Sequence, residues 1–314
     1  MQRTHFRPFV CLPAVLVLFA PASAAPQQAG MLVLEAPSSV ETMALGNAPY
    51  LFSSSPTHLF EAPSEIGRAE GVAASFQRYG GAGTLLSVAG AGDLLGGGFA
   101  LGLQYMRYSP ADGFPAERDM QSVAFEDGPV GVTELVASVG YAHDLFGFEV
   151  GGGVKYTEEN ADAAHDRGVA FDFGISRGIG PVRLAFTGRN FGKDPELAPG
   201  PEGPEPVGLE LPRQLVAGVS LRQFQLGPLD MFATSQVTRR RDGQYIPAGG
   251  IELSYWPVVG YTFRLRGGLQ RVVDDERSPF TLGAGFTADH ITLEYAFQAF
   301  DEHAGAHRLG LRWN

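Results

Sequence analysis

Apolar and polar residues alternate with a period of two from about residue 68 to the end of this chain. Between Ile291 and Gln298, for example, large apolar residues occupy every odd position and polar or small residues every even one. The same alternation recurs in residues 169–176, 261–270 and 308–313. Because successive side chains of a β-strand point to opposite faces, this pattern predicts strands with one apolar and one polar face.

About fourteen such segments follow one another, several of them roughly nine to thirteen residues long. An even number of long antiparallel strands is typical of bacterial outer-membrane barrels, whose strands need roughly 9 to 11 residues to cross the bilayer. Strands of soluble proteins usually have about five or six residues. The segments are centred near Phe76, Leu86, Leu103, Val136, Val150, Phe171, Leu184, Val219, Phe232, Ile251, Leu265, Gly283, Tyr295 and Leu309.

The predicted connections alternate between short and long. Residues 109–131, 158–166 and 192–211 are long and polar, whereas the connections near Asp144 and Asp289 are short. Outer-membrane barrels have short turns at one rim and longer loops at the other. An open sheet of this length would also leave two edges and an apolar face exposed, which closure within lipid removes.

We therefore predict an all-β fold: a closed transmembrane antiparallel β-barrel of about 14 strands over residues 68–314, with a small N-terminal plug. The acidic, proline-rich residues 194–212 are too polar to pack and are predicted to form a solvated loop on the outer side.

The first 24 residues have the features of a secretory signal peptide. Arg3 and Arg7 precede an apolar stretch that ends near Phe19, and an Ala-Ser-Ala cleavage site occupies residues 22–24. The chain's one cysteine, Cys11, lies within this peptide, so a mature protein beginning at residue 25 would contain none. We expect the mature protein in the outer membrane of a Gram-negative-type bacterium, with outer-membrane lipid as a partner.

Residues 25–67 show little periodicity and are interrupted by prolines. Two interpretations are open: a linker without fixed structure, or a plug inside the barrel. Apolar side chains that can anchor a packed segment favour the plug. The plug candidates are Leu51, Phe52, Pro56, Leu59 and Phe60.

Charge and motifs argue against nucleic-acid binding and catalysis. The chain has a net charge of −11, whereas nucleic-acid binders present basic surfaces. Gly174–Gly178 matches the G-x-S-x-G pattern, but no helical pattern follows it, so we assign Ser176 to the polar face of a strand. His303 and His307 are four residues apart in a predicted hairpin, where this spacing does not bring two metal ligands together. We expect no enzyme activity, no metal site and no cofactor.

Charged residues recur at positions predicted to face the barrel lumen. One interpretation is that the arginines pair with inward-facing acids, such as Glu252, because a buried charge needs a partner. The other is a lumen lining that selects what enters. We favour pairing. The lumen-facing candidates are Arg264, Arg266, Arg308, Arg312, Glu294 and Asp172.

Short stretches of the chain resemble the PorV/PorQ family of outer-membrane proteins, which are relatives of the FadL-type fourteen-stranded barrels. Residues 148–156 (FEVGGGVKY), 186–191 (FTGRNF), 265–268 (LRGG) and 307–313 (HRLGLRW) look similar to strands of that family. Near the N-terminus, the Ala-Leu-Gly at residues 44–46, followed by a Pro and a Leu, matches part of the family's opening motif, without its asparagine and glycine.

The resemblance implies a barrel with its N-terminal segment inside as a plug. In the PorV branch such barrels serve type IX secretion, and in the FadL branch they pass hydrophobic molecules sideways into the membrane. Our first hypothesis is a secretion-associated barrel whose partners are exported cargo proteins or secretion components. The alternative is a FadL-like transporter of a small hydrophobic ligand across the outer membrane. A soluble secreted β-protein is a third hypothesis, which the long strands disfavour.

Overall fold

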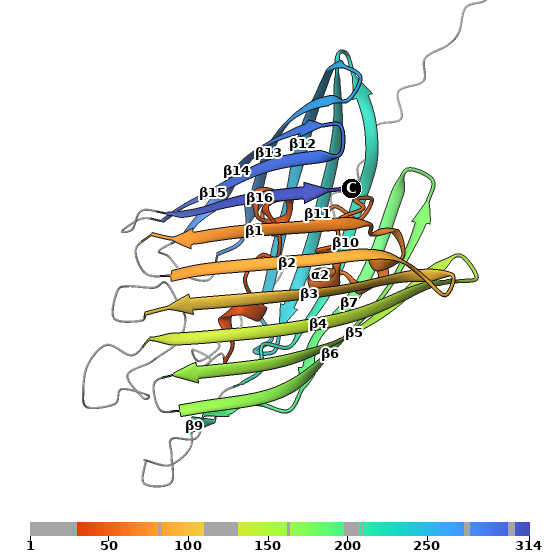
Figure 1. Cartoon of the computed structure of the whole chain (residues 1–314). Helices are drawn as coiled ribbons and strands as arrows, with labels where there is room; N and C mark the ends of the chain where they lie inside the picture. The colour runs from red at the N-terminus through yellow and green to blue at the C-terminus, as the bar shows by residue number, and fades with distance from the viewer. Residues whose placement is uncertain are drawn as a thin grey trace, which may run out of the picture.

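The computed structural model describes residues 30–80, 83–109, 131–161, 164–197, 207–208, 210–272, 277–300 and 305–314. Within these residues, fourteen antiparallel strands form a closed barrel (Figure 1). Each strand pairs with its neighbours along the chain, and pairing of the first with the last closes the barrel. The predicted fold class is confirmed, and each predicted segment centre lies within one of these strands.

The barrel strands are β1 (Gly71–Tyr79), β2 (Gly83–Leu94), β3 (Gly97–Tyr108), β4 (Val132–Leu145), β5 (Phe148–Ala161), β6 (Ala164–Ile179), β7 (Val182–Gly192), β10 (Gln214–Leu226), β11 (Leu229–Arg240), β12 (Tyr245–Val258), β13 (Tyr261–Gln270), β14 (Arg277–Ala288), β15 (Ile291–Phe300) and β16 (Ala306–Trp313). A separate two-stranded sheet consists of β8 (Glu196–Leu197) and β9 (Val207–Gly208). Four short helical elements precede the barrel: η1 (Leu32–Leu34), α1 (Val40–Ala44), α2 (His58–Glu61) and η2 (Pro63–Arg68). None of the described helices is long and apolar enough to cross a membrane.

The two rims of the barrel differ in their connections. At one rim, every connection between barrel strands has two residues: 95–96, 146–147, 180–181, 227–228, 259–260 and 289–290. At the opposite rim, connections range from two residues (162–163) to the long stretches 109–131 and 193–213. Short turns are typical of the periplasmic side, so we call the first rim the inner rim and the second the outer rim.

The predicted long polar loop at residues 158–166 is wrong. Strand β5 continues to Ala161 and β6 begins at Ala164, so both strands run into this stretch and only residues 162–163 separate them. Its charges alternate between the two faces: Glu159 is buried inside, whereas Glu158 faces outward and lies 3.4 Å from Arg167. Charges clustered in sequence favour a loop, but a hairpin at the rim can hold charges on both faces.

The prediction that residues 194–212 are too polar to pack is also wrong at the end of that stretch. Leu211 is buried, with 2% of its surface exposed, and belongs to a hydrophobic cluster with residues of the barrel interior. Residues 198–206 and 209 lie outside the described residues.

Large apolar side chains cover the outside of the barrel, whereas inward positions are small, polar or charged. On β13, Phe263 and Leu265 are exposed, while Thr262 and Arg266 between and beside them are buried. This arrangement suits a barrel that spans a bilayer, with lipid outside and a polar lumen.

Candidate functional site

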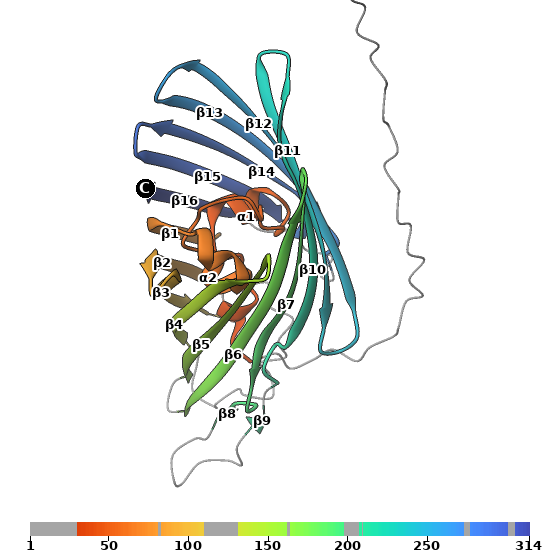
Figure 2. The ribbon, with the colours of Figure 1, turned by 90° about the vertical axis from the view of Figure 1, so that its right-hand side faces the viewer.

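Residues 30–70, which we call the internal segment, run through the inside of the barrel (Figure 2). At the outer end of β4, Glu134 accepts hydrogen bonds from the backbone N–H groups of Leu32 (3.0 Å) and Val33 (2.7 Å). Farther along, α1 packs against β13 to β16 and η2 against β3 to β6. The internal segment then passes into β1 at Gly71, on the inner rim, and so spans the lumen from rim to rim.

The wall strands carry glycine where the internal segment touches them. A Cβ atom at Gly268 would lie 2.0 Å from the backbone nitrogen of Gly46, and one at Gly151 would lie 2.1 Å from the carbonyl oxygen of Pro63. Both distances are far too short, so the segment's backbone lies directly on the wall, where no side chain fits. Backbone or Cβ atoms of the segment lie similarly close at Gly98, Gly250 and Gly283.

Arg308 of β16 is completely buried and holds the internal segment before α1. Its guanidinium donates hydrogen bonds to the carbonyl oxygens of Pro37 and Ser38, the latter at 2.8 Å. No ion pair joins it to a carboxylate among the described residues, in contrast to the pairing expected from the sequence. Its remaining acceptors are wall side chains of β1 and β2: Ser75, Gln77 and Ser87.

The two predicted lumen arginines on β13, Arg264 and Arg266, form ion pairs with acidic side chains. Arg266 donates to Glu252 through Nε and to Glu294 through Nη1, both at 2.6 Å. All three side chains are nearly inaccessible to solvent. Arg264 lies 3.5 Å from the same Glu252. This network crosses β12, β13 and β15 and neutralises the arginines inside the wall.

Two further predicted residues also have charged partners. Arg312 lies 3.7 Å from Glu41, which belongs to α1 of the internal segment. Asp172 lies 2.6 Å from Lys155, and its other oxygen accepts the backbone N–H of Asn190 at 2.8 Å. The structure thus shows partners for these side chains, while a role in selecting molecules stays a prediction.

The predicted plug residues Leu59 and Phe60 are buried. With Ile66 they form a cluster against wall alanines of β2, β3 and β4, where small side chains leave room for them. The alanines are Ala89, Ala100 and Ala142.

The other predicted plug residues contact β10 or the segment itself. Leu51 is buried, and its N–H donates to the hydroxyl of Ser220 (3.0 Å). The ring of Phe52 is partly buried, with the guanidinium of Arg222 5.2 Å from its centre. Pro56 is buried, and its carbonyl accepts a hydrogen bond from within α2.

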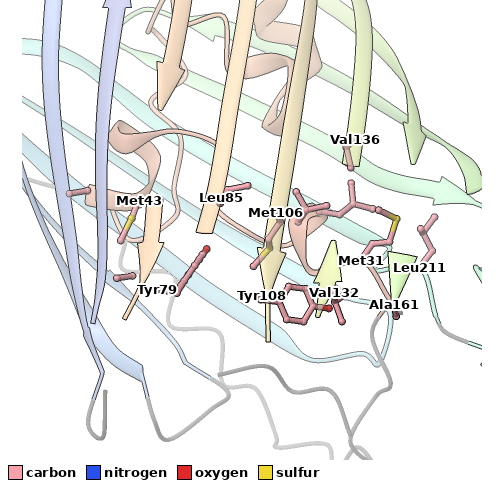
Figure 3. Close-up of a cluster of buried hydrophobic side chains, with 14 of the residues drawn as sticks. Met31, Met43, Tyr79, Leu85, Met106, Tyr108, Val132, Val136, Ala161 and Leu211 are labelled. Carbon is pink, nitrogen blue, oxygen red and sulfur yellow. The ribbon is translucent and has the colours of Figure 1, made fainter. Parts of the chain in front are cut away.

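A hydrophobic cluster joins the start of the internal segment to the outer ends of the strands. Met31 from the segment lies with Met106, Tyr108 and Val132 from β3 and β4 (Figure 3). Tyr108 also donates to Glu134, the carboxylate that holds η1. Apolar packing and a buried carboxylate therefore fix the same end of the segment.

A cavity of about 170 Å³, which we call the chamber, lies between the internal segment and the wall toward the outer rim. One part of its lining is apolar, from Leu32, Val33, Phe60 and Ile246. The other part is polar and carries charges of both signs, with amides from Gln104 and Gln214, the acids Glu35 and Glu61, and the cations Lys155, Arg189, Arg240, Arg271 and Arg277.

The cations of the chamber differ in their partners. Lys155 is paired with Asp172, and Arg240 lies 3.2 Å from Glu35. Arg189 instead donates to the amide oxygen of Gln214 at 2.6 Å. Its Nε is buried and has no hydrogen-bond partner within the described part of the chain. Arg189 is therefore a chamber cation with donor capacity left for a ligand.

The wall beside the chamber departs from regular pairing at β7. The register between β6 and β7 shifts so that Arg189 and Asn190 together face Asp172, which is a β-bulge. Asn190 has φ of 62°, a left-handed conformation that asparagine tolerates better than most residues.

Past this bulge, side chains replace the backbone ladder between β7 and β10. Strand β10 begins at Gln214, so the last three residues of β7 have no partner on it. Asn190 Nδ2 donates to the carbonyl of Pro212 (2.9 Å), and Arg213 Nη2 donates to the carbonyl of Gly192 (2.7 Å). We call this stretch the seam.

A pair of charges ties the connections of the outer rim together. Arg241 donates to both carboxylate oxygens of Asp194, at 2.5 and 3.0 Å, and the N–H of Leu211 donates to the same carboxylate at 3.2 Å. The hydrogen bond from the Arg241 guanidinium holds the pKa of Asp194 below its usual range. We call this pair the rim clamp.

The sequence analysis missed several residues that hold the internal segment. Glu65 of η2 and Arg183 of β7 are both buried and lie 2.7 Å apart, and Glu134 holds η1. The available signal was a charge on an inward-facing strand position, which Glu134, Lys155 and Arg183 all share. Which acid of the internal segment meets which wall residue cannot be read from spacing.

The residues considered for catalysis or metal binding have structural partners. Ser176 lies within β6 and accepts a hydrogen bond from Arg183 (2.9 Å). His307 lies on β16, with its Nδ1 2.7 Å from the hydroxyl of Tyr295, and His303 lies outside the described residues. The residues with described positions include no cluster of three or more His, Cys, Asp or Glu that could hold a metal ion.

No protein-family model matches the sequence, and no curated protein matches it. Several solved structures are similar. The Pseudomonas putida toluene transporter TodX is 12% identical, with 91% of this chain and 98% of that chain covered and a TM-score of 0.54. The CymD monoaromatic hydrocarbon channel is 11% identical over 88% and 96%, with a TM-score of 0.53. A Pseudomonas aeruginosa FadL homologue is 10% identical over 88% and 95%, with a TM-score of 0.51.

These neighbours are transport channels rather than enzymes. They support the FadL-like part of the predicted resemblance, and they do not show membership of the PorV/PorQ family. At this identity the likeness concerns the fold alone: the chain forms a closed antiparallel barrel of fourteen strands, similar to the fold of these channels and of the FadL homologue.

Proposed function

We propose that this protein is an outer-membrane transporter for small hydrophobic molecules that carry a polar or negatively charged group. The observation that carries this proposal is the chamber, which lies toward the outer rim against the internal segment. Two structural neighbours, a toluene transporter and a monoaromatic hydrocarbon channel, support the small hydrophobic part of this substrate class. No comparison and no described contact supports binding of exported proteins, so the transporter alternative replaces the secretion hypothesis.

The size and lining of the chamber narrow the class of substrate. An apolar cavity of roughly 150 Å³ binds benzene in another protein, so about 170 Å³ accommodates one small aromatic molecule. Leu32, Val33 and Phe60 offer an apolar surface to its ring. Arg189 offers a donor to its polar edge, since its Nε is buried without a partner in the described residues.

In this proposal the internal segment acts as the plug that blocks the direct path to the inner rim. Its hydrogen bonds and ion pairs with the wall make displacement costly. The seam borders the chamber through Arg189 and Gln214 and is closed by a few side-chain hydrogen bonds. A substrate leaves the chamber through the seam into the membrane, as the FadL resemblance implies.

Uptake by cells that produce the protein tests the substrate class. Radiolabelled toluene and benzoate enter producing cells faster than cells with an empty vector. Substitution Arg189→Gln slows benzoate more than toluene, because it removes a charge that only the carboxylate needs. The matched control is Arg239→Gln, on the outward face of β11. Equal uptake by producing and empty cells refutes the proposal.

A reversible cross-link tests the route. Arg189 and Gln214 are directly opposite in register, so cysteines at both positions form a disulfide across the edge of the seam. Oxidation slows uptake and a reductant restores it. A cysteine pair at Ala185 and Gly218, farther along the same two strands, is the control and leaves uptake unchanged on oxidation. Unchanged uptake with the seam pair oxidised excludes this exit.

A further inference from the structure

Polar and basic side chains form a continuous row on the outer face of the barrel, at the outer ends of four adjacent strands. His307 of β16 is directly opposite Arg78 of β1, Arg78 is opposite Thr84 of β2, and Thr84 is opposite Arg107 of β3. All four alternate with inward-facing residues and so point away from the lumen. We call these residues the basic row.

The basic row borders the apolar band that faces lipid. Two residues farther toward the middle of each strand, the outward positions are apolar or aromatic and remain in register with one another. The exposed fractions of these side chains are 61% for Leu309, 48% for Phe76, 41% for Leu86 and 39% for Tyr105. Because this band lies in the hydrocarbon region, the basic row lies at the depth of the lipid head groups on the outer side.

The two arginines of the basic row have no acidic partner in the part of the chain that the structure describes. Arg78 donates to the carbonyl of Gly80 (2.9 Å), and neither Arg78 nor Arg107 forms an ion pair within the described residues. Among the described residues, a chain with a net charge of −11 thus presents two arginines without a neutralising carboxylate at this level. The inner ends of the same strands present Val72, Phe99 and Trp313 outward instead.

We propose that the basic row binds the phosphate groups of an anionic lipid in the outer leaflet. Arginine presents planar, paired donors that match phosphate oxygens, and it stays charged at all relevant pH values. One strand, β2, lies between Arg78 and Arg107, and the two interstrand spacings place their backbones about 10 Å apart. Side chains of this length reach either one phosphate or two phosphates of the same head group, with Thr84 between them as a further hydrogen-bond donor.

Lipid retention by the purified, folded full-length protein tests this inference. The protein in detergent is titrated with lipid A that carries two phosphates and with the same lipid after dephosphorylation, and bound lipid is counted by native mass spectrometry. We expect the wild type to retain the phosphorylated lipid preferentially. The double substitution Arg78→Gln, Arg107→Gln weakens that retention about tenfold, since it removes two exposed charge contacts.

The control is Arg177→Gln, an outward-facing arginine at the inner end of β6, which retains lipid like the wild type. Heat-dependent gel migration verifies that every variant is a folded barrel. Equal retention of phosphorylated and dephosphorylated lipid, or unchanged retention by the double variant, overturns the inference. Displacement of the lipid by inorganic phosphate alone also overturns it, because the row would then be a site for free phosphate. None of these readouts depends on the proposed transport.

Discussion

Gly268 of β13 offers the sharpest test of how the internal segment is held. A Cβ at this position would lie 2.0 Å from Gly46 N and 2.3 Å from the carbonyl carbon of Leu45, both backbone atoms of the segment. Gly267, the preceding residue, faces the outside of the barrel, and a Cβ there meets nothing within 4 Å. Substitutions Gly268→Val and Gly267→Val therefore change the same strand by the same atoms and differ only in the face.

The expected cost follows from the geometry. A Cβ contact shorter than 3.0 Å is essentially never observed, so the segment must move by at least 3.0 − 2.0 = 1.0 Å. Such a shift breaks the hydrogen bond from Gly46 N to Thr281 (3.0 Å) and the one from Thr281 to the carbonyl of Ala44 (3.1 Å). Two lost hydrogen bonds at about 1 kcal/mol each, with about 1–3 kcal/mol for overpacking, destabilise the packing of the internal segment against the wall by roughly 3–5 kcal/mol.

Labelling of a buried thiol measures this displacement. The chain's one cysteine is in the predicted signal peptide, so a cysteine introduced at Met43, which is completely buried in α1, is the reporter. We expect a water-soluble thiol reagent to label it rapidly with Gly268→Val and slowly with Gly267→Val or the unsubstituted wall. Single-channel conductance is likewise expected to be higher for Gly268→Val than for Gly267→Val or the unsubstituted wall. Equal labelling and conductance for both valine variants would refute the close contact between segment and wall.

Two further predictions concern charges that hold the segment and the rim. Substitution Arg183→Leu leaves the buried Glu65 carboxylate unpaired and lowers the free energy of unfolding by about 3–5 kcal/mol, whereas the double substitution Arg183→Leu, Glu65→Leu recovers most of the loss. The urea midpoints of both variants measure the effect. A single variant as stable as the double variant contradicts the pairing. Because the folded-state pKa of Asp194 is lowered by Arg241, the rim clamp contributes stability above the ordinary aspartate pKa of about 4, and this contribution is lost as the pH falls through the lowered value. Amide hydrogen exchange of the adjoining connection, corrected for its intrinsic pH dependence, reports this loss. If the wild type and the Asp194→Asn variant have the same exchange profile at neutral pH, the clamp does not act.

The barrel wall could be predicted because its pattern is local. On β15, the alternation from Ile291 to Gln298 sets which face meets lipid, and a slip of one residue would exchange every side chain between lipid and lumen. The same reasoning found all fourteen strands. It failed at the tip of β5 and β6, because there both faces leave the bilayer and carry charge.

The internal segment could not be predicted in detail because its contacts are not local. Arg308 meets Ser38 across 270 residues of sequence, and Gly46 meets Thr281 across 235. The apolar anchors could be recognised from the composition of the internal segment, but their partners in the wall are small residues, such as Gly268. A glycine on the polar face of a strand satisfies the alternation in any case, so the sequence does not distinguish a place for a second backbone from an ordinary small lumen residue.

The seam illustrates the same limit at the candidate site. The stretch around Asn190 fits a regular strand in sequence, yet the structure places a bulge there and ends the ladder with β10. The bulge brings Asn190 N–H to Asp172, and Lys155 donates to the Asn190 side chain at 2.8 Å, so three strands stabilise one irregular residue. Polar contacts of this kind replace main-chain pairing where the wall meets the chamber. Opening the seam breaks only a few side-chain hydrogen bonds, each of about 1 kcal/mol. Expulsion of the internal segment also breaks buried ion pairs, at about 3–5 kcal/mol each. In the proposed transport, a small molecule in the chamber therefore meets a lower barrier toward the seam than toward the inner rim.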